Sequence, residues 1–159
     1  MLTKEDVEKE LYSIGVDHSN RFSRFIDLCI NYTLTDEAFN IGLYDSYTET
    51  DFLYKYRTIA KATWSNPRVN RKLMLSDEEL EVYNNLDDQV TIYRAMTSEE
   101  FENKDYGVSW TLKEKIAEDF LSHRRYQHTE IQSMQVDKND LKAYINCRNE
   151  HEVIYINNN

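Results

Sequence analysis

Apolar side chains in the first 88 residues recur at intervals of three and four positions, the spacing that gathers them on one face of an α-helix. The segments that carry this pattern are 3–14, 22–30, 35–44 and 51–64. Residues 3–6 and 76–79 each have a hydroxyl side chain followed three positions later by an acidic one, which is typical of a helix start. The pattern therefore predicts an N-terminal helical region over residues 1–88.

The apolar stripes of these helices are rich in aromatic residues, and we interpret them as core rather than as ligand-binding surfaces. The first two stripes consist of Val7, Leu11 and Ile14, then Phe22, Phe25, Ile26, Cys29 and Ile30. The stripe of 51–64 contains Phe52, Leu53, Tyr56, Ile59, Ala60 and Thr63. Because each helix has one apolar face, we expect these helices to pack against one another.

The pattern changes near residue 89, where short runs of β-branched and aromatic residues replace the helical spacing. Strands are predicted at 90–94, 106–110, 130–136, 141–146 and 152–156. After the second strand, Thr111 and Glu114 resemble a capping box ahead of a helix that runs to Leu121. With no flexible linker near residue 88, the sequence predicts an α+β fold in which 1–88 and 89–159 form two layers of one compact unit.

Composition supports a folded core and narrows the range of partners. The 159 residues are 40% hydrophobic and 13% aromatic, and their net charge is −10. Residues 1–90 carry −7 of this charge and residues 91–159 carry −3. An acidic surface repels phosphates, which argues against direct nucleic-acid binding and suits a basic protein partner. The same charge also fits a solvated surface that keeps the protein soluble.

Several other site classes are not expected. The chain has no run of about 18 apolar residues and no signal-peptide pattern at its start, so we expect a cytoplasmic protein with no membrane span. Cys29 and Cys147 are then expected to be free thiols. The four histidines show no metal-ligand spacing with each other or with the cysteines, and no metal is assigned.

Three chemical features lie at the ends of predicted strands. They are Arg94, the triplet Ser109-Trp110-Thr111, and the pair Glu150 and Glu152 on either side of His151. Taken singly, each has an ordinary explanation: a surface ion pair, a helix cap and two solvated carboxylates. Their order and their settings at strand ends are what make them a candidate site.

Together these features resemble the Arg/Ser/Glu class of mono-ADP-ribosyltransferases, the cholera-toxin-like and arginine-modifying enzymes. The likeness covers residues 90–156, with 15 positions from Arg94 to Ser109 and 41 from Ser109 to Glu150. The sequence also resembles small bacteriophage and bacterial proteins of this superfamily. The resemblance implies an ADP-ribosyltransferase-like split β-sandwich in residues 89–159 and, if the chain is phage-encoded, work in a host bacterial cytoplasm.

The resemblance also implies a role for each residue, with NAD⁺ as the substrate and no metal. Arg94 would hold the NAD⁺ phosphates or the nicotinamide ribose, since a guanidinium is a permanent charge with forked donors. Ser109 and Thr111 would shape the pocket and orient Glu152. Glu152 would be the catalytic carboxylate that stabilises positive charge on the ribose. The remaining cofactor-binding residues implied are Tyr93, Trp110 and Phe120, with Tyr126 as an alternative to Phe120 for stacking near the nicotinamide.

Glu150 would act on the acceptor side. If 150–152 is extended, Glu150 and Glu152 face one pocket while His151 points away. In this family, the two-glutamate form goes with modification of arginine, and the loop 146–149 would present the acceptor. Two positions depart from the family pattern: Trp110 replaces the central residue of the usual Ser-Thr-Ser triplet, and Ala95 stands where Gly commonly follows the arginine.

The resemblance therefore predicts an enzyme that transfers ADP-ribose from NAD⁺ to a protein side chain and releases nicotinamide. The acceptor side chain that it implies is arginine. The enzyme's target would be an unidentified protein, for which the acidic surface favours a basic one. Three alternatives stay open at this level. They are an NAD⁺ glycohydrolase on the same fold, a non-enzymatic acidic inhibitor or DNA mimic that binds a basic host protein, and a structural protein on a degenerate transferase fold.

Overall fold

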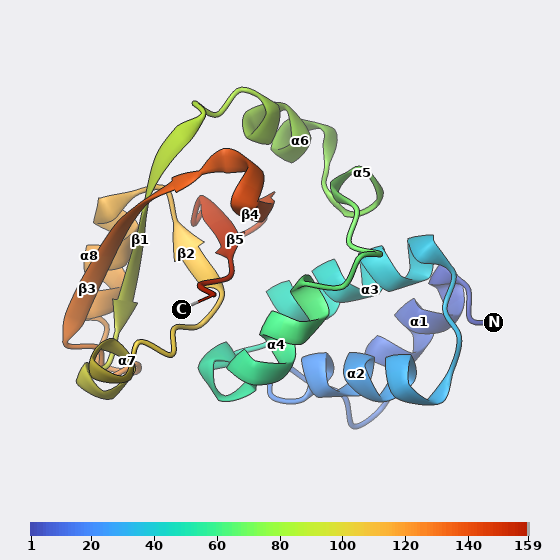
Figure 1. Cartoon of the computed structure of the whole chain (residues 1–159). Helices are drawn as coiled ribbons and strands as arrows, with labels where there is room; N and C mark the ends of the chain where they lie inside the picture. The colour runs from blue at the N-terminus through green and yellow to red at the C-terminus, as the bar shows by residue number, and fades with distance from the viewer. Residues whose placement is uncertain (159) are drawn as a thin grey trace. The chain divides into compact units, whose positions relative to one another are not determined.

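A computed structural model of the chain describes residues 1–158, in a mixed arrangement of helices and one antiparallel β-sheet (Figure 1). The chain divides into two compact units. One comprises Met1–Tyr56 and Asn66–Leu75, and the other comprises Arg57–Ser65 and the residues from Ser76 onward. We call them the helical unit and the sheet unit. Within residues 1–158, no helix combines the length and apolar character needed to cross a membrane.

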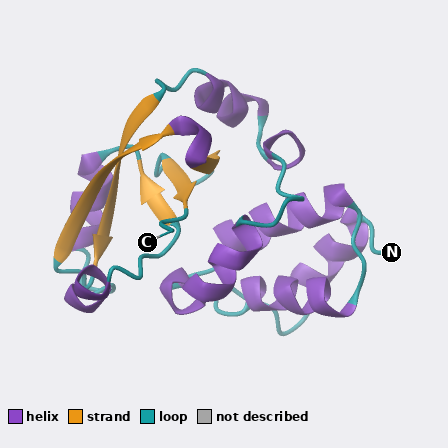
Figure 2. Cartoon of the chain, in the orientation of Figure 1, coloured by secondary structure: helices purple, strands orange, loops and turns teal. Residues whose placement is uncertain are grey.

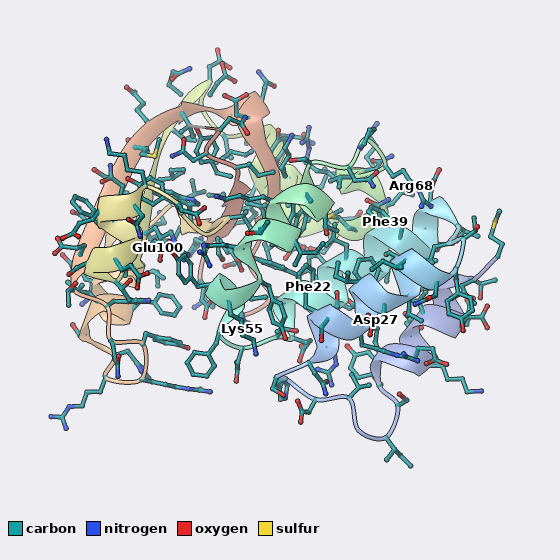
Figure 3. The ribbon with its side chains drawn as sticks, turned by 60° about the horizontal axis from the view of Figure 1, so that its bottom comes forward. Phe22, Asp27, Phe39, Lys55, Arg68 and Glu100 are labelled. Atoms are coloured by element: carbon teal, nitrogen blue, oxygen red, sulfur yellow. The ribbon has the colours of Figure 1, made fainter. Side chains whose placement is uncertain are left out.

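The helical unit is built on three helices that pack against each other. Its elements are α1 (Lys4–Leu11), α2 (Arg21–Asn31), α3 (Asp36–Thr48), a 3-10 turn at Leu53–Tyr56 and the short α5 (Arg71–Met74). Its core contains the buried side chains Val7, Leu11, Phe22, Phe25, Leu28, Phe39, Leu43 and Tyr47. The Thr3–Asp6 capping box predicted for α1 is present. On the surface of this unit, the Arg68 guanidinium lies 4.8 Å from the Phe39 ring centre (Figure 3).

Some of the predicted stripe positions are wrong. Ile14 and Ile30 are exposed at 106% and 74%, while Leu28, which was not assigned to a stripe, is buried. Ile14 lies outside because α1 already ends at Leu11, and Gly15 then turns the chain with a φ of +89°. Helix α2 buries Phe22, Phe25 and Leu28 at three-residue spacing, so position 30 rotates away from the core.

The sheet unit contains five strands in the order β3-β1-β2-β5-β4, and every neighbouring pair is antiparallel (Figure 2). The strands are β1 (Gln89–Met96), β2 (Ser109–Thr111), β3 (Glu130–Asp137), β4 (Leu141–Ile145) and β5 (Glu152–Tyr155). The helices of this unit are α4 (Arg57–Trp64), α6 (Asp77–Asn84), α7 (Ser98–Asn103) and α8 (Glu114–Ser122), with a 3-10 turn at Lys138–Asp140. Helix α8 packs against β1 and β3.

The sheet has two parts that meet at one point. Strands β1 and β3 pair along eight positions, and β2, β5 and β4 form a second ladder. The only register pair that joins β1 to β2 in the described chain is Tyr93 with Thr111. The core under the sheet contains Ile92, Met96, Tyr106, Trp110, Val136, Leu141, Tyr144 and Val153. A sheet with so short a junction between its two parts can splay there, and the predicted site residues Arg94 and Ser109 lie beside that junction.

Local structure differs from the sequence prediction at β2, at α7 and at the start of α8, and residues 51–64, predicted as one helix, form a 3-10 turn at Leu53–Tyr56 followed by α4. Strand β2 begins at Ser109, so residues 106–108 are not strand, and α7 was not predicted. The capping box at Thr111 and Glu114 is wrong: α8 has Lys113 at its N-cap, with no side-chain cap. The Thr111 hydroxyl instead donates to the Glu150 carbonyl oxygen at 2.8 Å, because Thr111 still belongs to the sheet.

The contacts of the chain divide it after Leu75 rather than near residue 88, and into two units rather than one. Helix α6 belongs with the sheet because its side chains form hydrogen bonds with the segments that connect the strands. The Glu79 carboxylate accepts from the Asn146 amide at 2.8 Å, and the Tyr83 hydroxyl donates to the Lys138 carbonyl at 3.0 Å. Helix α4 belongs there as well, since both Arg57 and Lys61 bond to Asp105 at 2.6 Å.

Candidate active site

Ser109 and Glu152 meet where β2 and β5 pair. Thr111 and Glu152 are register partners, and Ser109 lies two positions away on the same face of β2. The Ser109 hydroxyl donates a hydrogen bond to the Glu152 carboxylate. Glu152 is only 4% exposed, although it is a charged residue at the first position of its strand. A carboxylate buried in this way is unusual and needs compensating partners.

Arg148 provides the second partner of Glu152. Its Nη2 lies 3.4 Å from Glu152 Oε2 and 3.2 Å from Glu150 Oε2, so one guanidinium contacts both carboxylates. Burial raises the pKa of Glu152 above its ordinary 4.5, while the Arg148 charge and the Ser109 hydrogen bond oppose that rise. The result is a carboxylate that is poorly solvated but held in place from two sides.

The segment that carries the two glutamates is a tight loop rather than an extended chain. Asn149 and His151 both have positive φ, 58° and 47°, so the alternation expected for residues 150–152 is wrong. His151 does not point into solvent, because its Nδ1 lies 2.9 Å from the Tyr144 hydroxyl in a hydrogen bond. The two carboxylates still converge, but the loop and Arg148 bring them together rather than strand geometry.

This loop, residues 146–151, is anchored at both ends. The Asn146 side-chain oxygen accepts from the His151 amide at 3.0 Å, and the Asn146 amide itself donates to Glu79. Glu79 is 5% exposed and also accepts from the Ser76 amide at 3.0 Å in the capping box of α6. Thr111 closes the other side through its bond to the Glu150 carbonyl. The loop therefore presents its carboxylates from a fixed backbone.

Arg94 lies next to this pair, joined to it through Ser109. Its Nη1 donates to the Ser109 carbonyl oxygen at 2.7 Å, and its Nε donates to Glu100 Oε1 at 2.6 Å. The side chains of Arg94 and Glu100 are 13% and 2% exposed, and Figure 3 labels Glu100 in the sheet unit. Glu100 also accepts from the Gly107 amide at 2.9 Å. Arg94 is thus part of a buried ion pair and is bonded to the strand that carries Ser109.

Helix α7 and the turn after it form the cradle of Arg94. Thr97 caps α7 through the Glu100 amide, which leaves the Glu100 carboxylate available to Arg94. A Cβ at Gly107 would stand 2.5 Å from Arg94 Nη2, so the guanidinium fits against this glycine because no side chain is there. The neighbouring Ala95 is buried, with 6% of its surface exposed.

The other sequence-predicted cofactor residues are divided between the site and the core. Tyr93 is partly buried and pairs with Thr111 across the junction of β1 and β2. Trp110 does not join the Ser109 side: it is 2% exposed and packs edge-on against Tyr106 and Tyr155. Its burial follows from the alternation of β2, which sends Trp110 to the face opposite Ser109.

Phe120 belongs to an aromatic cluster beyond the C-terminal end of α8. Its ring centre lies 5.6 Å from that of Tyr126, and Tyr126 stacks on His128 at 5.4 Å with planes 14° apart. Burial lowers the pKa of His128, and the positive charge of Arg94 lowers it further. The rings of this cluster contact one another, and the contacts described here do not link them to Ser109, Glu150 or Glu152.

The contacts join Ser109, Thr111, Glu150 and Glu152 into one group, and Trp110 lies in the core. Arg94 reaches this group through the main-chain carbonyl of Ser109, because its side chain leaves β1 on the face opposite Tyr93, the register partner of Thr111. Sequence reasoning gave no site role to Glu79 or Glu100, and it included Asn146 and Arg148 only as members of the loop 146–149. Glu79 carried a signal of another kind, as the last residue of a predicted capping box. The contacts of the other three depend on residues that folding brings beside them.

Across residues 1–158, no group of three or more His, Cys, Asp and Glu side chains has an arrangement suited to a metal ion. Neither Cys29 nor Cys147 forms a disulfide. Burial raises the pKa of Cys29 to about 11, so that thiol stays protonated at neutral pH.

The arrangement can bind and act on a cationic centre. Two carboxylates, one of them buried and oriented by a serine, converge on a single guanidinium, and a second guanidinium supports the serine from behind. No protein-family model, no curated protein and no solved structure matches the chain.

Proposed function

We propose that this protein is an NAD⁺-dependent mono-ADP-ribosyltransferase that modifies arginine side chains of a target protein and releases nicotinamide. The observation that carries the proposal is the hydrogen bond from the Ser109 hydroxyl to the buried Glu152 carboxylate, with Arg94 bonded to the main-chain carbonyl of the same serine. The same three residue types, in the same order and settings, define the family that the sequence resembles. Their convergence from β1, β2 and β5 is what a shared site requires.

Glu152 is suited to cleave the nicotinamide–ribose bond. As that bond breaks, positive charge develops on the ribose, and a fixed carboxylate stabilises this transition state more than the ground state. Glycosidases use a carboxylate for the same purpose. The Ser109 hydrogen bond and the low exposure of Glu152 support the proposal because they fix the carboxylate before NAD⁺ binds.

Glu150 supports arginine as the acceptor. Its carboxylate already binds a guanidinium in the structure, that of Arg148, at 3.2 Å. An acceptor arginine offers the same group, so Glu150 can hold it beside Glu152 and take up a proton as the new bond forms. Arg94 has its charge paired with Glu100, which favours a role on the nicotinamide ribose and behind Ser109 over a role as the main phosphate clamp.

The fold is compatible with a split β-sandwich of the ADP-ribosyltransferase type. In residues 1–158, the register pair Tyr93 and Thr111 joins the β3-β1 pair to the β2-β5-β4 ladder, and so short a junction supports a sheet divided into two parts. The predicted catalytic residues lie along this division. The rings of Phe120 and Tyr126 offer faces on which a nicotinamide can stack.

The direct test is nicotinamide release and ADP-ribose transfer to a small guanidine compound by the purified chain. We expect Glu152→Gln to lower both rates by about 100- to 1,000-fold, the effect of removing one strong transition-state contact. Glu10→Gln is the matched control, because Glu10 is also paired with an arginine, Arg24, and lies in the helical unit. Full turnover by the Glu152 variant would contradict the catalytic assignment. No nicotinamide release by the native chain would favour the acidic-inhibitor alternative.

A second variant separates transfer from hydrolysis. Glu150→Gln removes the acceptor-side charge but leaves Glu152 and Ser109 in place. We expect transfer to the guanidine compound to fall about ten-fold or more, on the scale of one acid–base residue, while NAD⁺ hydrolysis changes little. An equal fall in both rates would argue against the acceptor role and for an NAD⁺ glycohydrolase, in which water is the only acceptor.

A further inference from the structure

Arg148 stands where the proposed reaction needs its acceptor. Its Nη2 contacts Glu150 and Glu152 at 3.2 Å and 3.4 Å, and its side chain is 39% exposed. It belongs to the loop between β4 and β5, whose backbone is fixed through Asn146 and Glu79. A guanidinium that contacts both carboxylates of the site has the chemistry and the position of a substrate.

We propose that Arg148 is a modification site, and that the protein transfers ADP-ribose to this arginine of its own chain. The inference rests on the proposed function, since it requires cleavage of NAD⁺ at Glu152. Arg148 would be the first acceptor that the site encounters, because it lies four positions before the catalytic carboxylate in the same chain. The acceptor therefore does not have to diffuse to the site.

Other arginines of the chain are less suited to this reaction. Arg94 is the other arginine beside Ser109, but its side chain is 13% exposed and donates to both Glu100 and Ser109. Arg24, Arg57 and Arg68 form ion pairs with Glu10, Asp105 and Asp36, none of which belongs to the candidate site. Arg148 combines a side chain that is 39% exposed with contacts to both site carboxylates.

The chemical step balances without a further reactant. The bond between ribose C1′ and the nicotinamide nitrogen breaks, and its electron pair leaves with neutral nicotinamide. A guanidine nitrogen of Arg148 forms the new bond to C1′ and loses one proton, which Glu150 accepts and passes to water. The products are an ADP-ribosylated Arg148, nicotinamide and one proton. Attack by a neighbouring side chain on a bound donor gains from its high effective concentration.

The first experiment incubates the native full-length chain with NAD⁺ and follows nicotinamide release, intact mass and peptide mapping together. We expect an added mass of one ADP-ribosyl group per chain, located on the peptide that contains Arg148. Nicotinamide release with no added group, or with the group on other residues, would overturn this inference and leave the proposed function standing. No nicotinamide release at all would overturn the proposed function and this inference with it.

Two arginine variants test the position. Arg148→Lys keeps the positive charge but removes the guanidine, and we expect it to lose at least 90% of the added mass. Arg24→Lys is the matched control, because Arg24 is also paired with a glutamate and is 38% exposed. We expect this control to be modified like the native chain. Equal labelling of the two variants would overturn the assignment, and thermal unfolding of both checks that each one folds.

A mixing experiment tests whether the reaction stays within one chain. Untagged native protein is mixed with an affinity-tagged Glu152→Gln chain, which keeps Arg148 but lacks the catalytic carboxylate. Label on the native chain only, with a rate constant that does not change on ten-fold dilution, is the expected result. Equal label on the tagged chain would show transfer between chains and would overturn the intramolecular part of the proposal.

Discussion

Glu152 is held in an environment that favours its neutral form. Burial raises its pKa, and a raised carboxyl pKa means that ionisation costs more in the folded state than in the unfolded one. This cost is absent below the ordinary pKa of 4.5 and grows as the pH rises toward the folded-state value. The residue proposed to stabilise a cation thus lowers the stability of the empty protein at neutral pH.

The first prediction follows from this destabilising effect of the Glu152 charge at neutral pH. Glu152→Gln keeps the shape of the side chain and removes its charge, so we expect the variant to melt higher than the native protein at pH 7.5 by about 2–4 °C, which corresponds to about 1 kcal/mol. At pH 4 the difference is expected to shrink, since the native carboxyl is then mostly protonated in both states. Calorimetry at the two pH values measures it. A variant that melts lower at pH 7.5 would mean that Arg148 and Ser109 stabilise the charge more than burial opposes it.

A substitution at Gly107 tests whether Arg94 needs its present position. We expect Gly107→Ala to push the guanidinium away from Glu100 and Ser109, because the new Cβ would stand 2.5 Å from Nη2 and 2.8 Å from Cζ. A cost of about 1–3 kcal/mol is typical of overpacking a buried site. The KM for NAD⁺ should rise at the same time.

The control for this prediction is Gly42→Ala, whose Cβ would meet the Phe25 ring at 2.7 Å inside the helical unit. It is expected to lower the melting temperature without raising the KM for NAD⁺. Similar KM values for the native protein and the Gly107 variant would show that Arg94 does not need its present position.

At the scale of elements, helix α6 and the loop 146–151 act as one structure through Glu79. One carboxylate oxygen closes the capping box with the Ser76 amide, and the other accepts from the Asn146 amide. Capping and loop anchoring therefore depend on the same buried side chain, and the loop that carries Glu150 is fixed by a helix 67 positions earlier in the chain.

The third prediction separates these two roles. Ser76→Ala removes the cap alone and is expected to cost about 1 kcal/mol, with little change in NAD⁺ cleavage. Glu79→Ala also leaves the buried Asn146 amide without its acceptor, and we expect about 1–3 kcal/mol more. Because the loop then loosens, nicotinamide release should fall as well. Urea unfolding and nicotinamide release measure the two effects, and equal activity in both variants would show that the loop does not need Glu79.

At the scale of the whole molecule, a net charge of −10 acts on any macromolecular acceptor. A basic target protein is attracted over distances of a Debye length, about 10 Å at 0.1 M salt, whereas a small acceptor experiences little of that field. NAD⁺ is itself anionic, so salt that screens the acidic surface does not weaken its approach. The charge thus favours basic target proteins without contributing to the bond-breaking step.

The fourth prediction uses this difference. Raising the salt from about 0.05 to 0.5 M should lower kcat/KM for transfer to a basic protein by about ten-fold or more, because steered association depends steeply on ionic strength. NAD⁺ hydrolysis and transfer to a small guanidine compound should change little in the same buffers. A salt effect of equal size on all three reactions would place the charge dependence at the NAD⁺ site and argue against steering of a basic target.

Local patterns in the sequence were sufficient for much of the secondary structure. The capping boxes at residues 3–6 and 76–79 formed as predicted, since their partners are only three residues apart. The strands at 130–136, 141–146 and 152–156 were predicted to within two residues, because short runs of β-branched and aromatic residues favour strands locally. The prediction of a mixed α and β fold rests on such short-range patterns and agrees with the structure.

Tertiary structure alone decided where the boundary falls and which residues complete the candidate site. Sequence patterns place Arg94, Ser109 and Glu152 at strand ends, but only the pairing of β2 with β5 brings the serine to the carboxylate. Arg148 and Glu100 had no pattern of their own, since a surface arginine and a helical glutamate are common and gain meaning from their partners. Hydrophobic periodicity reports which face of an element is buried, whereas ion pairs between distant residues depend on how the elements pack.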